Sequence, residues 1–125
     1  MIAVSKRVLY IDNDHADQCL FRIFLSGRGV DVDACHAPTE APILVRKNGY
    51  DAIFVDYRLP ILNGVQLIKK FMVDAHCPVY IVSAHDRNYI EKEISREGVE
   101  VAGFISKDGF RHNLEAVMDV LYGPA

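Results

Sequence analysis

The chain has 125 residues and a formal net charge of −3, with 50% hydrophobic and 25% charged residues. This length and balance are typical of one soluble domain with a single core and argue against a disordered chain. The acidic balance disfavours direct nucleic-acid binding, which needs clustered Lys and Arg. No apolar run approaches the roughly 18 residues that cross a bilayer, and the N-terminus does not resemble a signal peptide. We therefore expect a cytoplasmic protein without membrane contact.

The cysteines agree with that compartment. Cys19, Cys35 and Cys77 are odd in number and have no C-x-x-C spacing. Cys19 and Cys35 lie at apolar-periodic positions, which predicts small buried side chains. His76 and Cys77 have no second pair of ligands near them in the sequence, so a metal site there is disfavoured.

Five short segments have the pattern of strands. Residues 8–11, 52–55 and 79–82 are apolar at every position, which is typical of parallel strands buried on both faces. Residues 30–35 alternate with acids, which predicts an edge strand, and residues 103–105 predict a short fifth strand.

Helical patterns fill the gaps between these strands. The first helix is expected to follow Asp14 as N-cap and to end near Gly27 and Gly29. Thr39 is a candidate cap for a second helix over 39–48, which would place Pro42 in its first turn. The predicted apolar stripes are Ala16, Cys19, Leu20, Ile23 and Gly27; Val65, Ile68, Phe71, Met72 and Ala75; and Phe110, Leu114, Val117, Met118 and Leu121.

The remaining helix, over 87–97, has few apolar residues, namely Tyr89, Ile90 and Ile94, so we expect it to be weakly held. The alternation of strands and helices predicts a doubly wound α/β fold, with a five-stranded parallel sheet and five helices on its two faces. One domain would span 1–125, with its core over about 7–121. In such folds ligands bind beyond the carboxyl ends of the strands.

Polar residues follow four of the predicted strands. Asp12 comes after the first, Asp56 after the third, Ser83 after the fourth and Lys107 after the fifth. This set suits a carboxylate that accepts a phosphoryl group beside a divalent metal held by carboxylate and carbonyl oxygens. The hydroxyl and the ammonium would contact the phosphoryl oxygens.

From residue 8 to residue 121 the sequence resembles the receiver domains of two-component response regulators, which have a flavodoxin-like fold. The motifs that carry the resemblance are the apolar strand before Asp12; Ala52-Ile53-Phe54-Val55-Asp56 followed by Pro60 and Gly64; Val82-Ser83-Ala84; and Gly103-Phe104-Ile105-Ser106-Lys107. Their common order and spacing make the signature specific.

The resemblance implies that Asp56 is the phosphoacceptor and receives its phosphoryl group from a sensor histidine kinase or a phosphotransfer protein. It implies self-phosphorylation and autodephosphorylation, without an enzymatic activity on another substrate. Mg²⁺ would be held by Asp12, Asn13, Asp56 and the backbone carbonyl of Arg58.

The resemblance also assigns a switch. Ser83 matches the switch hydroxyl, Lys107 the family's lysine and Phe104 the aromatic residue that changes rotamer on activation. Residues 87–121 would form the output face, which binds a downstream protein and is a candidate surface for a homodimer.

Two positions in this region have two open interpretations. Arg58 and His85 lie two residues beyond Asp56 and Ser83, where receivers tune the lifetime of the phosphoryl group. They either shield the acyl phosphate or are solvated loop residues.

Two residues depart from the family pattern. Asn13 stands where a second acid is usual, which removes one negative charge and predicts weaker Mg²⁺ binding. Asp108 follows Lys107 where a cis-bonded proline is common, and a non-proline residue favours a trans bond.

Two alternatives remain open at this point. Residues 9–14 also match the opening motif of haloacid-dehalogenase-type phosphatases, with Asp12 as nucleophile and Asp14 as general acid. The other alternative is a pseudo-receiver, which binds proteins without being phosphorylated, and Asn13 and Asp108 are the residues that favour it.

Overall fold

Strands and helices alternate along the whole of the described chain. The computed structural model describes residues 5–84, 87–107 and 110–123, with the backbone alone for 110–113. The strands are β1 (Lys6–Ile11), β2 (Val30–Cys35), β3 (Ala52–Asp56), β4 (Val79–Ser83) and β5 (Gly103–Ser106). The helices are α1 (His15–Ser26), α2 (Ala41–Lys47), α3 (Gly64–Phe71), α4 (Arg87–Glu97) and α5 (Phe110–Tyr122).

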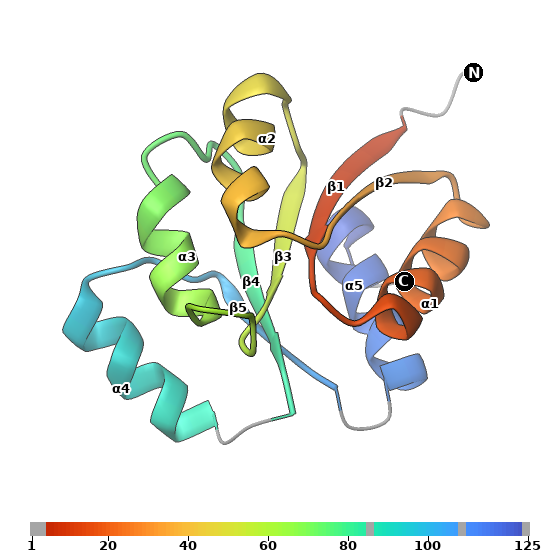
Figure 1. Cartoon of the computed structure of the whole chain (residues 1–125). Helices are drawn as coiled ribbons and strands as arrows, with labels where there is room; N and C mark the ends of the chain where they lie inside the picture. The colour runs from red at the N-terminus through yellow and green to blue at the C-terminus, as the bar shows by residue number, and fades with distance from the viewer. Residues whose placement is uncertain (1–4, 85–86, 108–109, 124–125) are drawn as a thin grey trace.

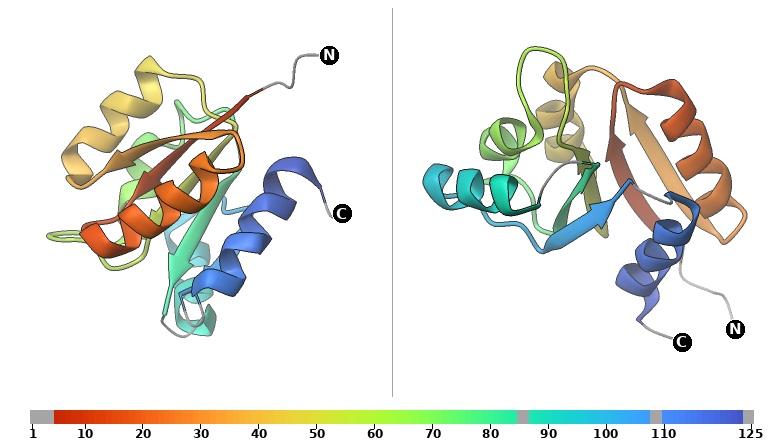
Figure 2. Two further views of the ribbon diagram at one scale, coloured as in Figure 1. Left: turned by 90° about the vertical axis from the view of Figure 1, so that its right-hand side faces the viewer. Right: turned by 90° about the horizontal axis from the view of Figure 1, so that it is seen from below.

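All five strands are parallel and lie in the order β2-β1-β3-β4-β5. α1 and α5 cover one face of the sheet, while α2, α3 and α4 cover the other (Figure 1). The two further views in Figure 2 show the same three layers. The predicted doubly wound α/β fold is confirmed, and β2 is an edge strand as expected.

The core consists of two apolar clusters, one on each face of the sheet. Consecutive residues of a strand point to opposite faces, so strands covered on both sides are apolar throughout. On the α1 and α5 side, the ring of Phe21 stacks on Tyr10 at 4.1 Å between centroids and lies 5.4 Å from that of Phe54. Buried aromatic rings thus join α1 to β1 and β3.

The apolar stripe expected for α1 is wrong. Its buried residues are Gln18, Phe21 and Leu25, whereas Ile23 is 72% exposed and Cys19 is exposed. Apolar residues occur around much of this helix, and the ring stack fixes which side faces the sheet. Gln18 is buried because its side-chain amide donates to the carbonyl oxygens of Asp12 at 2.5 Å and Cys35 at 3.0 Å.

Helix starts agree in part with the sequence. Asp14 caps α1 as predicted, and its Oδ1 accepts a hydrogen bond from the Asp17 amide at 3.0 Å. The cap assigned to Thr39 is wrong, because Thr39 lies inside a short 3-10 turn, Pro38–Glu40. α2 therefore begins at Ala41 without a side-chain cap, and Pro42 is in its first turn as predicted.

In the described part of the chain, every helix is too short or too polar to span a bilayer.

Candidate phosphoacceptor site at the carboxyl edge of the sheet

Asp12 directly follows β1 and is completely buried. Its Oδ2 accepts hydrogen bonds from the Tyr10 hydroxyl at 2.6 Å and from the Lys107 ammonium at 2.9 Å. Its Oδ1 accepts from the Asp14 backbone amide at 2.9 Å. A buried carboxylate needs this number of partners to stay charged.

Asp56 ends β3 and is 5% exposed. Burial, together with the neighbouring charge of Asp12, raises the pKa of the Asp56 carboxyl to about 7, although the Lys107 ammonium acts in the opposite direction. Its Oδ1 lies 3.3 Å from the Lys107 Nζ. Two carboxylates therefore share one cation at this edge of the sheet.

Lys107 follows β5 and connects the two carboxylates with a third. Its Nζ lies 2.9 Å from Asp12, 2.9 Å from Asp17 and 3.3 Å from Asp56. An ammonium has three N–H donors, so these three carboxylates match its capacity. Burial alone would lower the pKa of Lys107, but its hydrogen bonds to Asp17 and Asp12 and the charge of Asp56 raise it above its ordinary value.

Asp17 is the site residue that the sequence analysis missed. It lies in the first turn of α1, and Asp14 contacts its backbone amide. The predicted N-cap at Asp14 already placed Asp17 in that first turn, beside the carboxyl end of β1. This signal was available in the sequence.

The loop after Asp56 ends at Gly64, and its geometry requires a glycine there. The Gly64 amide donates to the Tyr57 carbonyl at 2.8 Å and closes the loop over residues 57–64. A Cβ atom on Gly64 would lie 2.7 Å from the Asp56 carbonyl oxygen. Only glycine lets the start of α3 approach the end of β3 this closely.

Ser83 and Phe104 lie on neighbouring strands beside a cavity. Ser83 is buried at the end of β4, and its carbonyl accepts from the Lys107 amide at 3.0 Å. A cavity of about 230 Å³ lies here, lined in part by Ser83, by the half-buried Phe104 and by the exposed Arg87. The Arg87 guanidinium lies 4.6 Å from the centroid of the Phe104 ring.

The other predicted site residues lie at the rim or outside the description. Asn13 and Arg58 are exposed in the loops after β1 and β3. His85 and Asp108 lie outside the described residues, so neither the role of His85 nor the bond before Asp108 is assessed. His15 and His36 are exposed, and their rings lie 4.3 Å apart.

The donor set at this edge fits Mg²⁺. Mg²⁺ prefers hard oxygen ligands and is usually bound by one or two carboxylates together with water. Asp12 and Asp56 supply two buried carboxylates, and the Arg58 carbonyl is a further oxygen close in sequence. Among the described residues no group of three or more His, Cys, Asp or Glu is arranged to hold a metal. Carbonyl and water oxygens would therefore have to complete the set.

Comparison with known families identifies the class. The family model of the response regulator receiver domain matches residues 8–119. The chain belongs to the receiver domains of response regulators, as its sequence motifs indicated.

Individual relatives agree with this family. The chain is 27% identical over 104 residues to the regulatory protein VanRB of Enterococcus faecalis, and the aligned region covers 83% of this chain and 46% of VanRB. It is 28% identical over 107 residues to the polar-differentiation response regulator DivK of Brucella ovis, covering 83% and 85% of the two chains. The chain spans less than half the length of VanRB, of the response regulator GtcR of Aneurinibacillus migulanus and of a protein-glutamate methylesterase/protein-glutamine glutaminase of Haloarcula marismortui.

Solved structures share the fold. The chemotaxis protein CheY4 of Vibrio cholerae superposes with a TM-score of 0.82 at 17% identity, covering 94% of this chain and 99% of that one. A response regulator of Burkholderia pseudomallei, solved with a phosphorylated aspartic acid, a calcium ion and citrate, has a TM-score of 0.79 at 20% identity. It covers 93% of this chain and 66% of that one.

Proposed function

We propose that this receiver domain accepts a phosphoryl group on Asp56 from a phosphohistidine of a sensor kinase or phosphotransfer protein, in the presence of Mg²⁺. One observation carries the proposal: the buried carboxylates of Asp12 and Asp56 lie against the Lys107 ammonium at the carboxyl edge of the sheet. In the transfer, an Asp56 oxygen forms a bond to phosphorus. The bond from phosphorus to the histidine nitrogen breaks, and that nitrogen keeps the electron pair.

Mg²⁺ would be held by Asp12, Asp56 and the Arg58 carbonyl, with Asn13 at the rim, and it supplies positive charge to the phosphoryl oxygens when bound. The Burkholderia pseudomallei relative, with its phosphorylated aspartic acid and calcium ion, supports this combination. Small phosphodonors would also phosphorylate Asp56, and the acyl phosphate would hydrolyse by itself.

The switch follows from the charge that the phosphoryl group adds, about −1.5 to −2 at neutral pH. Lys107 turns from Asp12 and Asp17 toward a phosphoryl oxygen, and the Ser83 hydroxyl donates to another. The cavity beside Ser83 gives Phe104 a place to move into. These changes alter the face formed by α4, β5 and α5, which we propose binds a downstream protein or a second copy of this chain.

Arg58 and His85 are the proposed tuning residues. Arg58 is exposed beside the phosphoacceptor loop, where its guanidinium can reach an acyl phosphate. If the tuning proposal holds, Arg58→Ala and His85→Ala change the decay rate of the phosphorylated protein.

One alternative keeps a specific observation in its favour. Asn13 leaves the pocket without its usual second acid, which supports a pseudo-receiver that binds partners without phosphorylation. The phosphatase alternative has lost its general acid, because the Asp14 carboxylate caps α1.

The decisive experiment treats the protein with Mg²⁺ and acetyl phosphate and follows intact mass, with beryllofluoride and amide NMR as the second arm. Asp56→Asn and Asp12→Asn are compared with the wild type, and Asp31→Asn, an exposed acid on β2, is the control. Loss of modification in Asp56→Asn, with normal modification in Asp31→Asn, supports the proposal. Modification that survives in Asp56→Asn but not in Asp12→Asn favours the phosphatase, and none in the wild type favours the pseudo-receiver.

A further inference from the structure

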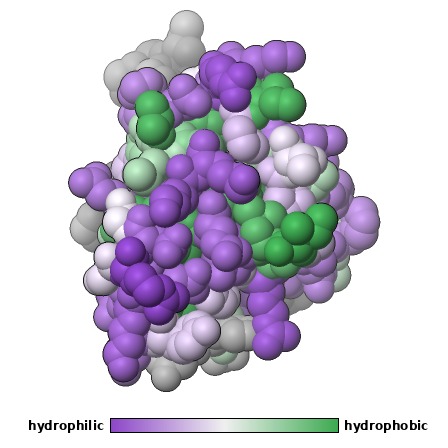
Figure 3. All heavy atoms as spheres, turned by 60° about the vertical axis from the view of Figure 1, so that its left-hand side comes forward, coloured by the Kyte–Doolittle hydropathy of each residue, from purple (hydrophilic) through white to green (hydrophobic). Residues whose placement is uncertain are grey.

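α4 is held to the rest of the protein by few buried side chains. Among its 11 residues only Ile90 and Glu93 are buried, and Tyr89 is 63% exposed. The surface of α2, α3 and α4 is hydrophilic over most of its area (Figure 3). Of the two buried residues of α4, Glu93 carries a carboxylate, and a buried carboxylate needs hydrogen bonds to compensate for its lost hydration.

Both oxygens of Glu93 have such partners. Oε1 accepts from the Tyr57 hydroxyl at 2.6 Å, and Oε2 accepts from the Asn63 side-chain amide at 2.8 Å. Hydrogen bonds to a charged acceptor are shorter and about twice as strong as neutral ones. Glu93 is thus the polar counterpart of Ile90 in holding α4.

The two donors belong to the loop that starts at the phosphoacceptor. Tyr57 directly follows Asp56, and its backbone amide donates to the Val82 carbonyl at 3.0 Å. Asn63 is the N-cap of α3, and its Oδ1 accepts from the Gln66 amide at 2.9 Å. Both ends of the loop therefore converge on one carboxylate of α4.

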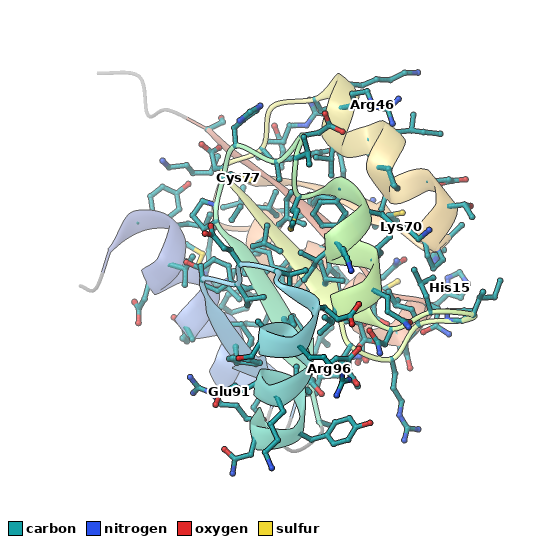
Figure 4. The ribbon with its side chains drawn as sticks, turned by 90° about the vertical axis from the view of Figure 1, so that its left-hand side faces the viewer. His15, Arg46, Lys70, Cys77, Glu91 and Arg96 are labelled. Carbon is teal, nitrogen blue, oxygen red and sulfur yellow. The ribbon has the colours of Figure 1, made fainter. Side chains whose placement is uncertain are left out.

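α4 lies next to α3, as a link between Glu93 and the N-cap of α3 requires. In Figure 4, α4, marked by Glu91 and Arg96, lies beside α3, marked by Lys70. At the surface the two helices are joined by an exposed ion pair, in which the Lys69 Nζ lies 3.4 Å from Glu97. Such exposed pairs contribute little, which leaves the buried pair of hydrogen bonds as the specific connection.

We propose that Glu93 anchors α4 to the loop after the phosphoacceptor, so that a change at Asp56 reaches the α4–β5–α5 face through Tyr57 and Glu93 as well as through Ser83 and Phe104. The transmission rests on the proposed phosphorylation of Asp56. The anchor exists in the unmodified protein and is measurable without phosphorylation.

The anchor is tested by amide hydrogen exchange of α4 in the unmodified protein. Tyr57→Phe keeps the ring but removes the donor. Glu93→Gln removes the negative charge and places an NH₂ group, in place of an acceptor oxygen, against either the Asn63 amide or the Tyr57 hydroxyl. Both variants are expected to speed α4 exchange about ten-fold, because Tyr57→Phe removes one hydrogen bond to the buried carboxylate and Glu93→Gln removes the charge that strengthens both.

The matched control is Glu97→Gln, which breaks the exposed pair between the same two helices and is expected to change α4 exchange less than two-fold. In the double variant Tyr57→Phe with Glu93→Gln, the increase in the α4 exchange rate should be much smaller than the product of the two single-variant increases, because both residues belong to one network. Wild-type exchange rates of α4 in both single variants overturn the anchor.

The transmission is tested by adding Mg²⁺ and beryllofluoride and recording amide NMR shifts. In Tyr57→Phe we expect wild-type shifts around Ser83 and Phe104, with the shifts over residues 90–97 reduced by at least half. Unreduced shifts in α4 overturn the transmission but not the anchor. If the wild type shows no shift at any residue, the proposed phosphorylation and the transmission both fail, and hydrogen exchange still decides the anchor.

Discussion

β3 and α4 lie in adjacent layers and differ in how many of their side chains are buried. Every residue of β3 is buried, and hydrogen bonds join it to β1 on one side and β4 on the other. α4 buries only Ile90 and Glu93. The proposed phosphoacceptor Asp56 thus lies on a fully buried central strand, and the proposed output face includes a helix with few buried side chains. A change of charge at a rigid site is best read out by an element that moves easily.

The largest expected effect tests the rigid side. Phe54→Ala removes a ring that is completely buried between Phe21 and Tyr80, and should lower the free energy of unfolding by about 3–5 kcal/mol. Urea denaturation measures this, with Ile23→Ala on the exposed side of α1 as the control. A loss below about 1 kcal/mol would show that β3 is less well packed than its burial indicates.

The contrast itself is measurable in the wild type. The amides of β3 should exchange only on global unfolding, whereas those of α4 exchange through local opening, so that β3 is protected about 100-fold more than α4. Hydrogen exchange followed by NMR gives both values in one experiment. Equal protection would remove the distinction between the two regions.

Asp56→Asn should stabilise the protein in metal-free buffer. Burial and the charge of Asp12 raise the pKa of Asp56 to about 7 from 3.8, so the folded state binds the proton more tightly than the unfolded state. The free energy of unfolding therefore falls as pH rises from about 4 to about 7, and this loss is complete above pH 7. The variant should gain of the order of 2 kcal/mol at pH 8 and less at pH 5.

Asp31→Asn on β2 is the control for this pH dependence. A stability gain for Asp56→Asn that is the same at both pH values would contradict the assigned cause.

Ile61, in the loop between Asp56 and α3, should be a position where glycine stabilises. It is fully exposed, at 102%, and has a positive φ of 75°, which is costly for a β-branched residue. Ile61→Gly relieves this strain without loss of buried contacts, and the gain should exceed the entropic cost of glycine by about 0.5–1 kcal/mol. Thermal unfolding tests the sign, and a lower Tm would contradict it.

The smallest effect concerns the charge of the pocket. Asn13→Asp restores a second acid after β1 and should tighten Mg²⁺ binding by about three-fold. Titration of the variant and the wild type with Mg²⁺, followed by NMR, measures the ratio. Equal affinities would show that position 13 does not contribute to the metal site.

The sheet and the main site were predictable because their signals are local. Continuous apolar runs specify buried parallel strands, and Asp12, Asp56 and Lys107 then meet because parallel strands end at one edge, where β4 also ends in Ser83. The buried side of α1 was not predictable, because its apolar residues surround the helix and only the packing of Phe21 on Tyr10 selects a face.

Most of what was missed depends on how side chains are placed in the folded protein. Glu93 looks like one more acid of a polar helix, and its partner Tyr57 is 36 residues away in the sequence. Tyr10 looks like an ordinary strand residue, and its hydrogen bond to Asp12 appears only when the side chains are placed. Asp17 differs from both, since the predicted cap at Asp14 was enough to locate it.

The three carboxylates around Lys107 have a consequence for how the chain is made. Lys107 lies 95 residues after Asp12, so a ribosome completes β1, β2, β3 and β4 before the cation for Asp12 and Asp56 has been synthesised. Closing the core earlier would bury two acids without their counter-charge, which is strongly unfavourable. We therefore expect final compaction of the nascent chain only after its last strand emerges, at the edge of the sheet where it can still be added.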